Sequence, residues 1–539
     1  MIRPALGGPF FFEERMPHSS IIESMTRPDF YPHRPQTVEL VQTHISCVFI
    51  AGDYVYKVKK PVNFGFLDFT SLEKRKFYCD EELRLNKRLA PSIYLDVVPI
   101  VRDDLGRLSL ASGQKIVDYA VRMKKLPLEN MLKILLASGQ ADAKTMDAVA
   151  EKIARFHKVA QTGGAIDEMG AVKTIRHNHE ENFAQTEKYI DVTIPAGQYQ
   201  FIKAYVEKFL AASRPLLEKR VAEHKIRDCH GDLHLEHICI ADDIIVFDCI
   251  EFNERFRCGD VAAEVAFLTM DLDYNGYFRQ SEDFVCSYLK YSGDTDMHAL
   301  LNFYRCYYAY VRGKVISFRL DQKEIPDAQR DDIKKVASKY FDLAYTYATH
   351  LEKPVLILTA GLIGSGKSYQ ARHLAQRLGA DVIRTDVLRK ELLNIAPVEK
   401  HHESFGQGIY TTDISQKTYE KAVELAAEKI DQGKPVIIDA SFKNRSDRAL
   451  AANLAQRLRA PFYIIECTCP DDVVKVRLEK RMLDHDNPSD GRWEILQEQK
   501  KQYEAISEFP ADCCFKVDTS DHPEMMRQNI VQTIKMAEL

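Results

Sequence analysis

Apolar positions recur along this chain with either the period of two that is typical of strands or the longer period of helices. In the first hundred residues the period of two is prominent. Short β-rich runs occupy Ser46–Ala51 and Tyr54–Lys60, and Gly52-Asp53 between them is typical of a hairpin turn. A charged stretch with helical spacing, Leu72–Leu89, ends before Pro91. Further β-rich runs lie at Asp96–Val101 and Lys115–Met123. This part of the chain is predicted to form a small sheet with one helix laid on it.

From about Pro127 to Ala222 the pattern becomes helical, and more helices follow the loop after Asp228 up to about His350. Beyond a short linker, Glu352-Lys353-Pro354, continuous apolar runs alternate with amphipathic helices. These runs are Val355–Leu358, Val382–Arg384, Pro435–Asp439, Phe462–Glu466 and Phe515–Val517. Apolar strands that alternate with helices predict a parallel sheet covered on both faces, with its chemistry beyond the carboxyl ends of the strands.

The 539 residues are too many for one core, so at least two domains are expected. We predict a loose tail over residues 1–20 and a first domain over 21–350. A second domain is predicted over 351–539. The fold class is mixed α/β and α+β: a two-lobe first domain with a small sheet and many helices, then a parallel sheet between helices.

Composition narrows the class of protein only slightly. The hydrophobic share of 45% and charged share of 28% are those of a soluble globular protein. A net charge of −5 gives no global basic field for nucleic acid, although a local patch stays possible. The twelve cysteines are dispersed without zinc-finger spacing. No apolar run approaches the length of a membrane span, and the first twelve residues make a poor signal peptide, so a cytoplasmic location is expected.

The most specific motif is Gly361-x-x-x-x-Gly366-Lys367-Ser368, which lies between a predicted strand and a predicted helix. The backbone N–H groups of such a loop cradle phosphate oxygens at the positive end of the helix. Lys367 can reach the β- and γ-phosphates, and the Ser368 hydroxyl can bind Mg²⁺. The predicted nucleotide-binding residues are Gly361, Leu362, Ile363, Gly364, Ser365, Gly366, Lys367 and Ser368. Residues 351–539 are therefore predicted to form a P-loop kinase or AAA-type ATP-binding domain.

A second chemically rich segment is His230-Gly-Asp232-Leu-His234, followed sixteen residues after Asp232 by Asp248 at the end of an apolar strand. A phosphotransferase of the kinase type needs one carboxylate to orient the acceptor hydroxyl and a second to hold Mg²⁺ against the phosphates. It also needs a lysine on a strand, and the period of two places Lys57 and Lys59 on one face of Tyr54–Lys60. The alternative is a pair of ordinary loop carboxylates.

These residues resemble the aminoglycoside phosphotransferase (kinase-like) family over roughly residues 35–345. The phrases Phe64-Gly-Phe-Leu-Asp-Phe and Ile250-Glu-Phe-Asn resemble the branch found in bacterial two-domain proteins. The resemblance implies that Lys57 pairs with the ATP phosphates and that Glu82 anchors it, with Lys59 and Glu81 as the alternatives in register. It further implies Asp232 as catalytic base and Asp248 as the principal Mg²⁺ ligand.

His237 departs from this family, which usually has a metal-binding Asn five residues after the catalytic Asp. Imidazole is a poor ligand for Mg²⁺, which prefers oxygen. Three interpretations remain open. The second metal is lost or repositioned, for instance through Glu251; His237 binds nucleotide or substrate itself; or this half is a degenerate kinase that binds without turnover.

The P-loop half carries further candidates. Asp386 and Arg389 follow the second predicted strand, Asp439 ends the third, and Arg477 and Arg481 lie four apart on one helix. The set resembles the small P-loop kinases that include polynucleotide kinases and zeta toxins. That resemblance implies Asp386 as acceptor base and Arg389 as the holder of an acceptor phosphate, with Asp439 near the metal. Arg477 and Arg481 fit a closing lid. The alternatives are a helix N-cap for Asp386 and a solvated face for the two arginines.

The sequence thus predicts an ATP-dependent phosphotransferase that uses Mg²⁺ and moves the γ-phosphoryl group to a hydroxyl. The acceptor would be a small molecule or a nucleotide. One alternative is a regulatory protein whose N-terminal half only binds nucleotide. A second is a nucleic-acid end-modifying kinase, which would need a basic groove that the net charge does not indicate. The sequence does not define the acceptor, the oligomeric state or any communication between the halves.

Overall fold

The computed structural model describes residues 18–65, 67–110, 115–322, 325–395, 407–482, 492–520 and 524–538, and it forms two compact units. The first unit comprises residues up to Thr193 together with Leu210–Tyr340, and the second comprises Ile194–Phe209 and Phe341–Leu539. Most of the predicted N-terminal tail lies outside the described residues, and helix α1 (His18–Met25) begins within its last three. The domain boundary near residue 350 stays a prediction.

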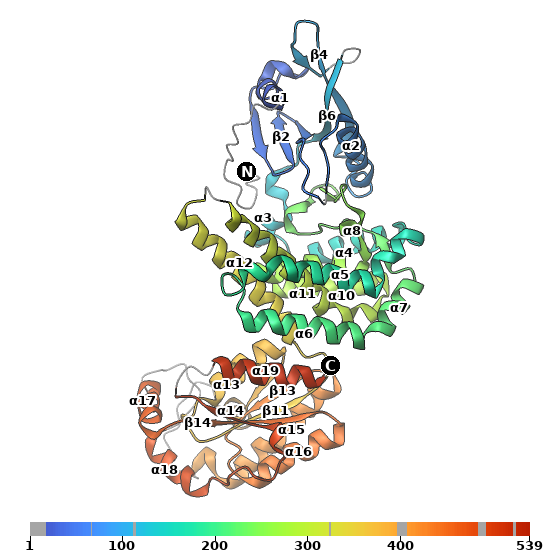
Figure 1. The fold of residues 1–539 in the computed structure, drawn as a ribbon. Coiled ribbons are helices and arrows are strands. Elements are labelled where there is room, and N and C mark those ends of the chain that lie inside the picture. Colours follow the sequence, from blue (N-terminus) through green and yellow to red (C-terminus); the bar gives the residue numbers. More distant parts are fainter. Residues whose placement is uncertain are drawn as a thin grey trace. The chain divides into compact units, whose positions relative to one another are not determined.

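The first unit opens with a six-stranded antiparallel sheet, with α2 (Leu72–Asn86) lying against it (Figure 1). The strands are β1 (Val38–Gln42), β2 (Ser46–Ala51), β3 (Tyr54–Lys59), β4 (Tyr94–Arg102), β5 (Leu108–Ser109) and β6 (Lys115–Lys124), in the order β1-β2-β3-β6-β4-β5. The predicted hairpin is confirmed, because β2 and β3 pair with Ala51 opposite Tyr54 and Gly52 turns at a φ of 64°. Phe49, Tyr56 and Val58 are buried on the core side.

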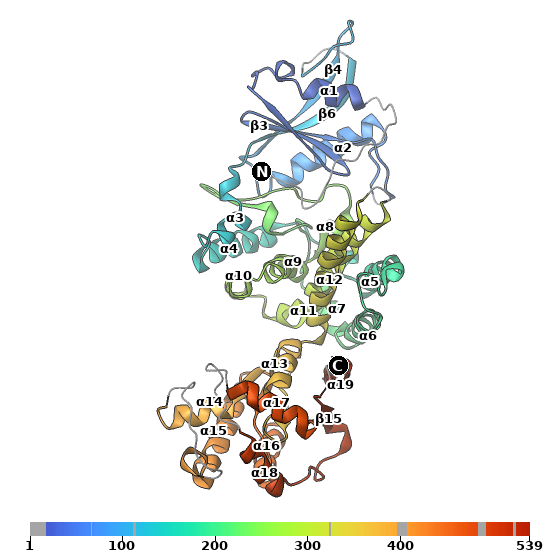
Figure 2. The same ribbon diagram turned by 90° about the vertical axis from the view of Figure 1, so that its left-hand side faces the viewer.

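Helices dominate the rest of the first unit (Figure 2). They include α4 (Ala143–Val159), α5 (Val172–Thr186), α7 (Arg214–Ala222), α8 (Glu254–Arg257), α9 (Val261–Tyr274), α10 (Phe278–Ser292), α11 (His298–Ser317) and the part of α12 (Asp327–Thr349) up to Tyr340. Helix α9 is central, since every residue from Val261 to Leu272 is buried. A short strand, β7 (Ile226–Asp228), leads into the loop with Asp232, and a hairpin of β8 (Ile238–Ile240) and β9 (Ile244–Val246) follows it.

The second unit is the predicted parallel sheet between two helical layers (Figure 1). Its strands are β11 (Leu356–Ala360), β12 (Asp381–Arg384), β13 (Val436–Asp439), β14 (Phe462–Thr468) and β15 (Cys514–Asp518), in the order β12-β13-β11-β14-β15. All five residues of β11 are buried. One face packs against α13 (Lys367–Leu378) and α19 (Glu524–Glu538), and the other against α14 (Thr385–Leu392), α15 (Thr412–Asp431) and α16 (Arg445–Leu458).

Burial on both faces explains why these strands are continuous apolar runs rather than alternating ones. A third, smaller cluster lies where α17 (Asp471–Met482) and α18 (Trp493–Gln502) meet Leu362 and Ile363 of the P-loop. Among the described residues, no helix is long and apolar enough to cross a bilayer.

Candidate active sites

In the first unit, the two strand lysines share one carboxylate but reach different loops. The Nζ of Lys57 lies 2.9 Å from Glu82 Oε1 and 2.6 Å from Asp248 Oδ1. Lys59 Nζ lies 2.7 Å from Glu82 Oε2 and also pairs with Glu251. Burial opposes the charge on Lys57, but Asp248 and Glu82 outweigh it and raise its pKa well above the usual value. Glu81 instead pairs with Arg84, so the structure joins Glu82 rather than Glu81 to the strand lysines, and both Lys57 and Lys59 contact it.

The pairing of Lys59 with Glu251 also bears on the hypothesis that Glu251 binds the metal in place of the Asn that His237 replaces. Glu251 is 6% exposed and its pKa is raised by burial, although Lys59 opposes this. Its carboxylate is directed to Lys59, so the geometry gives no support for a metal repositioned through Glu251.

The loop that carries Asp232 is fixed by its backbone. Glu264 Oε1 on α9 accepts hydrogen bonds from the N–H groups of His230 and Gly231, each at 2.7 Å. The other oxygen of Glu264 lies 2.6 Å from His157 Nε2. Gly231 has a φ of 84°, and a Cβ there would come within 2.8 Å of Arg257 Cα. A side chain at position 231 would therefore collide with the backbone of Arg257.

His230 ties this loop to the one that carries Asp248. Burial lowers the pKa of His230 to about 4, so its ring is neutral at pH 7. Its Nε2–H donates to Phe247 O over 3.0 Å, while Nδ1 accepts from the N–H of Asp232 at 3.3 Å. The N–H of Ile250 in turn donates to His230 O over 3.1 Å. The two loops with the candidate carboxylates are thereby joined on both sides of His230.

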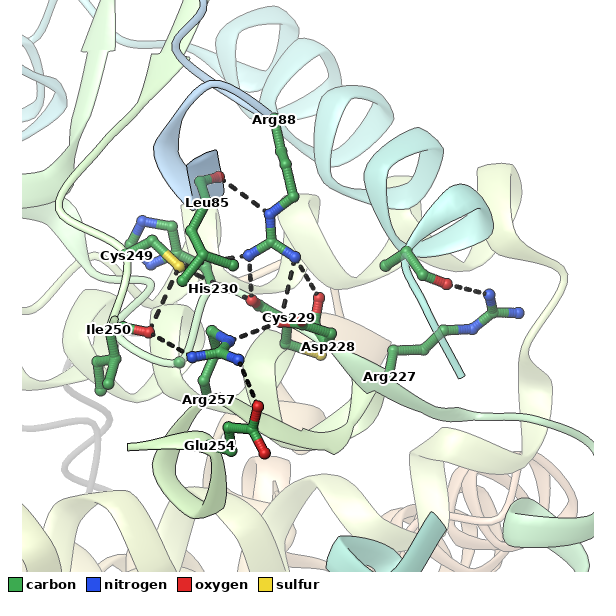
Figure 3. A network of polar contacts seen from close by, with 12 residues as sticks. Leu85, Arg88, Arg227, Asp228, Cys229, His230, Cys249, Ile250, Glu254 and Arg257 are labelled. Carbon is green, nitrogen blue, oxygen red and sulfur yellow. Dashed lines mark hydrogen bonds and ion pairs between the residues drawn. The ribbon is translucent and has the colours of Figure 1, made fainter. Parts of the chain in front are cut away.

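Arg88, just beyond the C-terminal end of α2, makes a second tie between the same loops (Figure 3). Its guanidinium donates to the carbonyl oxygens of Asp228 and Cys229, each over 2.8 Å. Asp228 also accepts from Arg257 Nε over 2.7 Å, and Arg257 donates to Ile250 O over 3.1 Å. Arg257 thus links the segment before His230 to the segment after Asp248, and Arg88 holds the first of these segments.

Asp232 and Asp248 flank His237. The Nδ1 of His237 lies 2.9 Å from Asp232 O, and its Nε2 lies 3.5 Å from Asp248 Oδ2. Burial would raise the pKa of both aspartates, but His234 at Asp232 and Lys57 at Asp248 outweigh it, so both pKa values fall below the usual range. Asp248 does not end a strand as expected: β9 stops at Val246, and Asp248 takes a left-handed φ of 64° that turns its side chain toward Lys57.

Magnesium fits this first site poorly. The Asp248 oxygen that is not paired with Lys57 faces an imidazole nitrogen, whereas Mg²⁺ selects oxygen ligands.

In the second unit, the P-loop joins β11 to α13. Gly366, with a φ of 86°, is the N-cap of α13, and a Cβ on Gly364 would meet Val474 Cγ1 at 2.6 Å. Lys367 Nζ donates to Leu362 O over 2.8 Å, so the lysine folds back over its own loop. The hydroxyl of Ser365 is buried without a hydrogen-bond partner among the described residues. An orphaned donor inside a glycine-rich loop at a helix N-terminus fits a phosphate-binding site.

Oxygen ligands for Mg²⁺ are present at this second site. Ser368 lies in the first turn of α13, and Asp439 ends β13, opposite Thr359 of the P-loop strand. Asp439 is 6% exposed, and its Oδ1 accepts from Thr359 Oγ1 over 3.2 Å. A hydroxyl and a carboxylate are hard oxygen donors, so these residues fit Mg²⁺.

Asp386 and Arg389 lie beside this carboxylate. Burial first and then Asp439 raise the pKa of Asp386, and Arg389 and Lys367 only partly offset this. The N-cap interpretation of Asp386 is wrong, because Arg384 is the N-cap of α14 and Asp386 is its second residue. Arg389 donates to Ile409 O at 3.2 Å and Ser415 Oγ at 3.1 Å, and its guanidinium lies 5.0 Å from the centre of the Tyr410 ring.

Arg477 does not lie on a solvated face. Its guanidinium donates to Thr519 Oγ1 over 2.9 Å and to Thr519 O, and Thr519 Oγ1 donates to Ser365 O over 2.8 Å. Arg477 therefore contacts the residue that supports the P-loop. Arg481 is on the same helix, α17, but its side chain lies outside the described residues.

Several supporting residues were not predicted from the sequence: Arg88, His157, Arg257, Glu264, Gln499 and Thr519. Glu264 did leave a signal, since an acidic residue in an apolar helix needs a buried partner. The others make contacts that depend on the tertiary fold, such as that of Gln499 Oε1, which accepts from the N–H of Ile363 in the P-loop over 2.9 Å.

A kinase-like unit with strand lysine, helix glutamate and two loop aspartates, together with a P-loop unit, defines a kinase-type phosphotransferase. Residues 74–301 match the phosphotransferase enzyme family, and residues 356–506 match an AAA domain. An uncharacterized protein of Mycobacterium tuberculosis is 31% identical over 445 residues, covering 82% of this chain and 86% of its own length. A Mycobacterium bovis protein matches to the same extent. The chain belongs to the same family as these mycobacterial proteins.

Two solved structures are also similar. A choline/ethanolamine kinase family protein from Mesorhizobium loti is 13% identical with a TM-score of 0.35, covering 60% of this chain and 99% of its own. A gluconokinase from Sinorhizobium meliloti is 21% identical with a TM-score of 0.26, covering 35% of this chain and 95% of its own.

Proposed function

We propose that the protein is an ATP-dependent phosphotransferase with two separate active sites, each moving the γ-phosphoryl group of ATP to a hydroxyl. The observation that carries the proposal is the meeting of Lys57, Glu82 and Asp248 from three distant segments of the first unit. The ion pair to Glu82 holds the ammonium group in place for phosphate oxygens, which strand position alone would not do.

In the first unit, Asp232 would orient the acceptor hydroxyl. Its carboxylate is kept ionised by His234 and His237 and lies on a loop fixed by Glu264. An ionised carboxylate on a rigid loop can accept a hydrogen bond from the hydroxyl and its proton as the bond to phosphorus forms.

In the second unit, Lys367 and the loop N–H groups would bind the phosphates, and Ser368 and Asp439 would hold Mg²⁺. That ion would neutralise charge on the phosphate oxygens. Asp386 would act as acceptor base, with its raised pKa suited to taking a proton. Arg389 would hold an anionic part of the acceptor. Arg477, attached to the P-loop through Thr519, would stabilise charge on the transferred group.

The test uses four forms of the full chain: wild type, Lys367→Ala, Asp232→Asn and the double variant. ADP release is measured with a panel of sugar, amino-alcohol and nucleoside hydroxyl acceptors. Each single variant should lose only the transfer to its own acceptor, and the double variant should lose both. Wild-type turnover in the double variant would refute the proposal.

His237, where the family has asparagine, favours one second candidate: a first unit that binds nucleotide without turnover. In that case Lys367→Ala alone abolishes all transfer, while nucleotide binding to the first unit persists and weakens on Lys57→Met.

A further inference from the structure

Helix α11 places Arg312 beside the loop that carries Asp232. Four residues earlier, on the same face of this helix, Tyr308 stacks on Phe267 of α9, with ring centres 4.3 Å apart and an angle of 11° between the ring planes. The Phe267 ring lies in turn 5.9 Å from the ring of His234, two residues after Asp232. These contacts bring the side of α11 that bears Arg312 to the candidate catalytic loop.

The guanidinium of Arg312 also lies against a pair of stacked tyrosines. It is 5.7 Å from the centre of the Tyr340 ring, and Tyr340 stacks on Tyr274 with ring centres 3.7 Å apart. Tyr274 ends α9, about one turn after Asp271, whose Oδ2 accepts from the N–H of Leu235 over 3.0 Å. Arg312 is thus held next to the same loop from a second direction.

The charge of Arg312 is retained but is not neutralised by an ion pair. Burial opposes this charge, but three neighbours outweigh burial and raise the pKa of Arg312 above its usual value. They are Tyr340, Asp232 and Asp271. Both carboxylates are directed to other groups, since Asp271 binds the loop backbone and Asp232 lies between two imidazoles. The Arg312 side chain is only half-buried, so a ligand can reach it.

Lys339 adds a second positive charge at the same pair of tyrosines. Its Nζ donates to Tyr274 O over 2.9 Å and lies 4.0 Å from the centre of that ring. Across the part of the chain that the structure describes, neither Arg312 nor Lys339 forms an ion pair with a carboxylate. Glu236, four residues after Asp232, is already paired with Lys133. Positive charge is therefore available to a ligand on the side of the loop that faces Arg312.

We propose that the acceptor of the first unit is a hydroxyl compound that carries an anionic group, and that Arg312 binds this group while Asp232 orients the hydroxyl. A guanidinium presents parallel N–H donors that match two oxygens of a carboxylate or a phosphate. The same group repels an ammonium, so it selects against cationic amino alcohols. The inference rests on the proposed function of this unit and deepens it by giving the charge of the acceptor.

The probes are two sets of acceptors that differ only in charge. One contains glycerate, glycerol 3-phosphate, glycerol and 3-aminopropane-1,2-diol, and the other contains glucuronate, glucose 6-phosphate, glucose and glucosamine. Transfer is measured as kcat and KM in the full chain with Lys367→Ala, and binding without ATP is measured by calorimetry. We expect the anionic members to be preferred, and the comparison of carboxylate with phosphate shows which anion fits.

Arg312→Gln should raise KM and Kd for the preferred anionic acceptor at least about tenfold and leave kcat/KM for its neutral counterpart unchanged. Arg312→Lys should restore part of the loss, because it keeps the charge without the planar fork. The matched control is Lys314→Gln on the same helix, whose ammonium donates to Asn182 Oδ1 and Gln185 Oε1. This variant should leave both constants unchanged. Circular dichroism checks that each variant is folded, and the lysine variant stays informative if the glutamine variant is not.

Three results would overturn the inference: preference for a cationic or neutral member, an equal fall of kcat for all acceptors in Arg312→Gln, or anion binding that does not depend on Arg312. Failure of the proposed function is separate. Anion binding that depends on Arg312, with no transfer to any acceptor, leaves the anion site standing and removes the function. Transfer that depends on Asp232 but not on Arg312 leaves the function standing and removes the anion site.

Discussion

Lys57 and Lys59 lie two residues apart on β3, but the carboxylates that surround them differ in how exposed they are. Lys59 is 1% exposed between two buried carboxylates, Glu82 and Glu251. The Asp248 partner of Lys57 has a side chain that is 42% exposed and so remains partly hydrated. Removing Lys59 leaves buried negative charge uncompensated, whereas removing Lys57 leaves Glu82 paired.

We therefore expect Lys59→Met to lower the free energy of unfolding of the first unit by about 3–5 kcal/mol. Lys57→Met should cost less stability and abolish transfer by this unit. Urea unfolding followed by circular dichroism measures the change. The single tryptophan, Trp493, lies in the second unit, so its fluorescence is an internal control that should not shift. Equal destabilisation by the two variants would contradict this assignment.

At the second site, the raised pKa of Asp386 gives a pH prediction. If Asp386 must be ionised to accept a proton, transfer should fall as the pH drops through its pKa, which lies above the ordinary 3.8. A carboxyl whose pKa is raised by folding stabilises the protein below its unfolded pKa, and this contribution is lost as the pH rises through the folded value. Asp386→Asn should thus remove transfer without lowering stability at neutral pH.

The measurement is kcat/KM against pH in the Asp232→Asn background, together with ATP affinity. Unchanged transfer in Asp386→Asn would show that Asp386 has no catalytic role. Asp386 would then have neither of the roles considered for it, since its place as second residue of α14 already rules out capping.

At the scale of elements, the geometry of the first site depends on how the end of α2 is held against β7. Arg88 donates to the carbonyl oxygens of Asp228 and Cys229, two residues and one residue before His230 (Figure 3). We expect Arg88→Met to reduce transfer by the first unit on the order of 10- to 100-fold, because small displacements of catalytic groups are costly.

The matched control for this element is Arg227→Met. Arg227 is on β7, next to Asp228, and donates to Ala160 O over 2.7 Å rather than to the loops that carry Asp232 and Asp248. Steady-state kinetics in the Lys367→Ala background compare the two variants. A similar loss in both would mean that Arg88 acts through general stability and not through positioning.

At the scale of the whole molecule, each unit has hydrophobic clusters of its own among the described residues: one on the antiparallel sheet of the first unit, and one on each face of the parallel sheet of the second. Silencing one site by a single polar substitution should therefore leave the other unit folded, which makes the two-site test of function interpretable. The described residues include all twelve cysteines, each a free thiol, so neither core depends on a disulfide.

Much of the fold could be predicted from local sequence, and the physical reason is periodicity. The run Val355–Leu358 is apolar at every position because both faces of the sheet are covered there, and Gly52-Asp53 indicated the turn between β2 and β3. The P-loop is contiguous, so its eight residues could be named in advance. Lys57 and Lys59 shared a face through the period of two, but periodicity could not say which one reaches Asp248.

Only the tertiary structure decided how residues distant in sequence combine. From the sequence, Glu251 was a candidate metal ligand, but in the fold it pairs with Lys59. Asp386 was a candidate N-cap, but α14 begins at Thr385, so that Arg384 is the N-cap. The contacts of His237 also depend on the fold, which sets its Nδ1 on Asp232 O and its Nε2 opposite Asp248. Sequence specifies local backbone preference and burial pattern over a few residues, whereas ion pairs and metal ligands form across loops whose approach depends on the packed core.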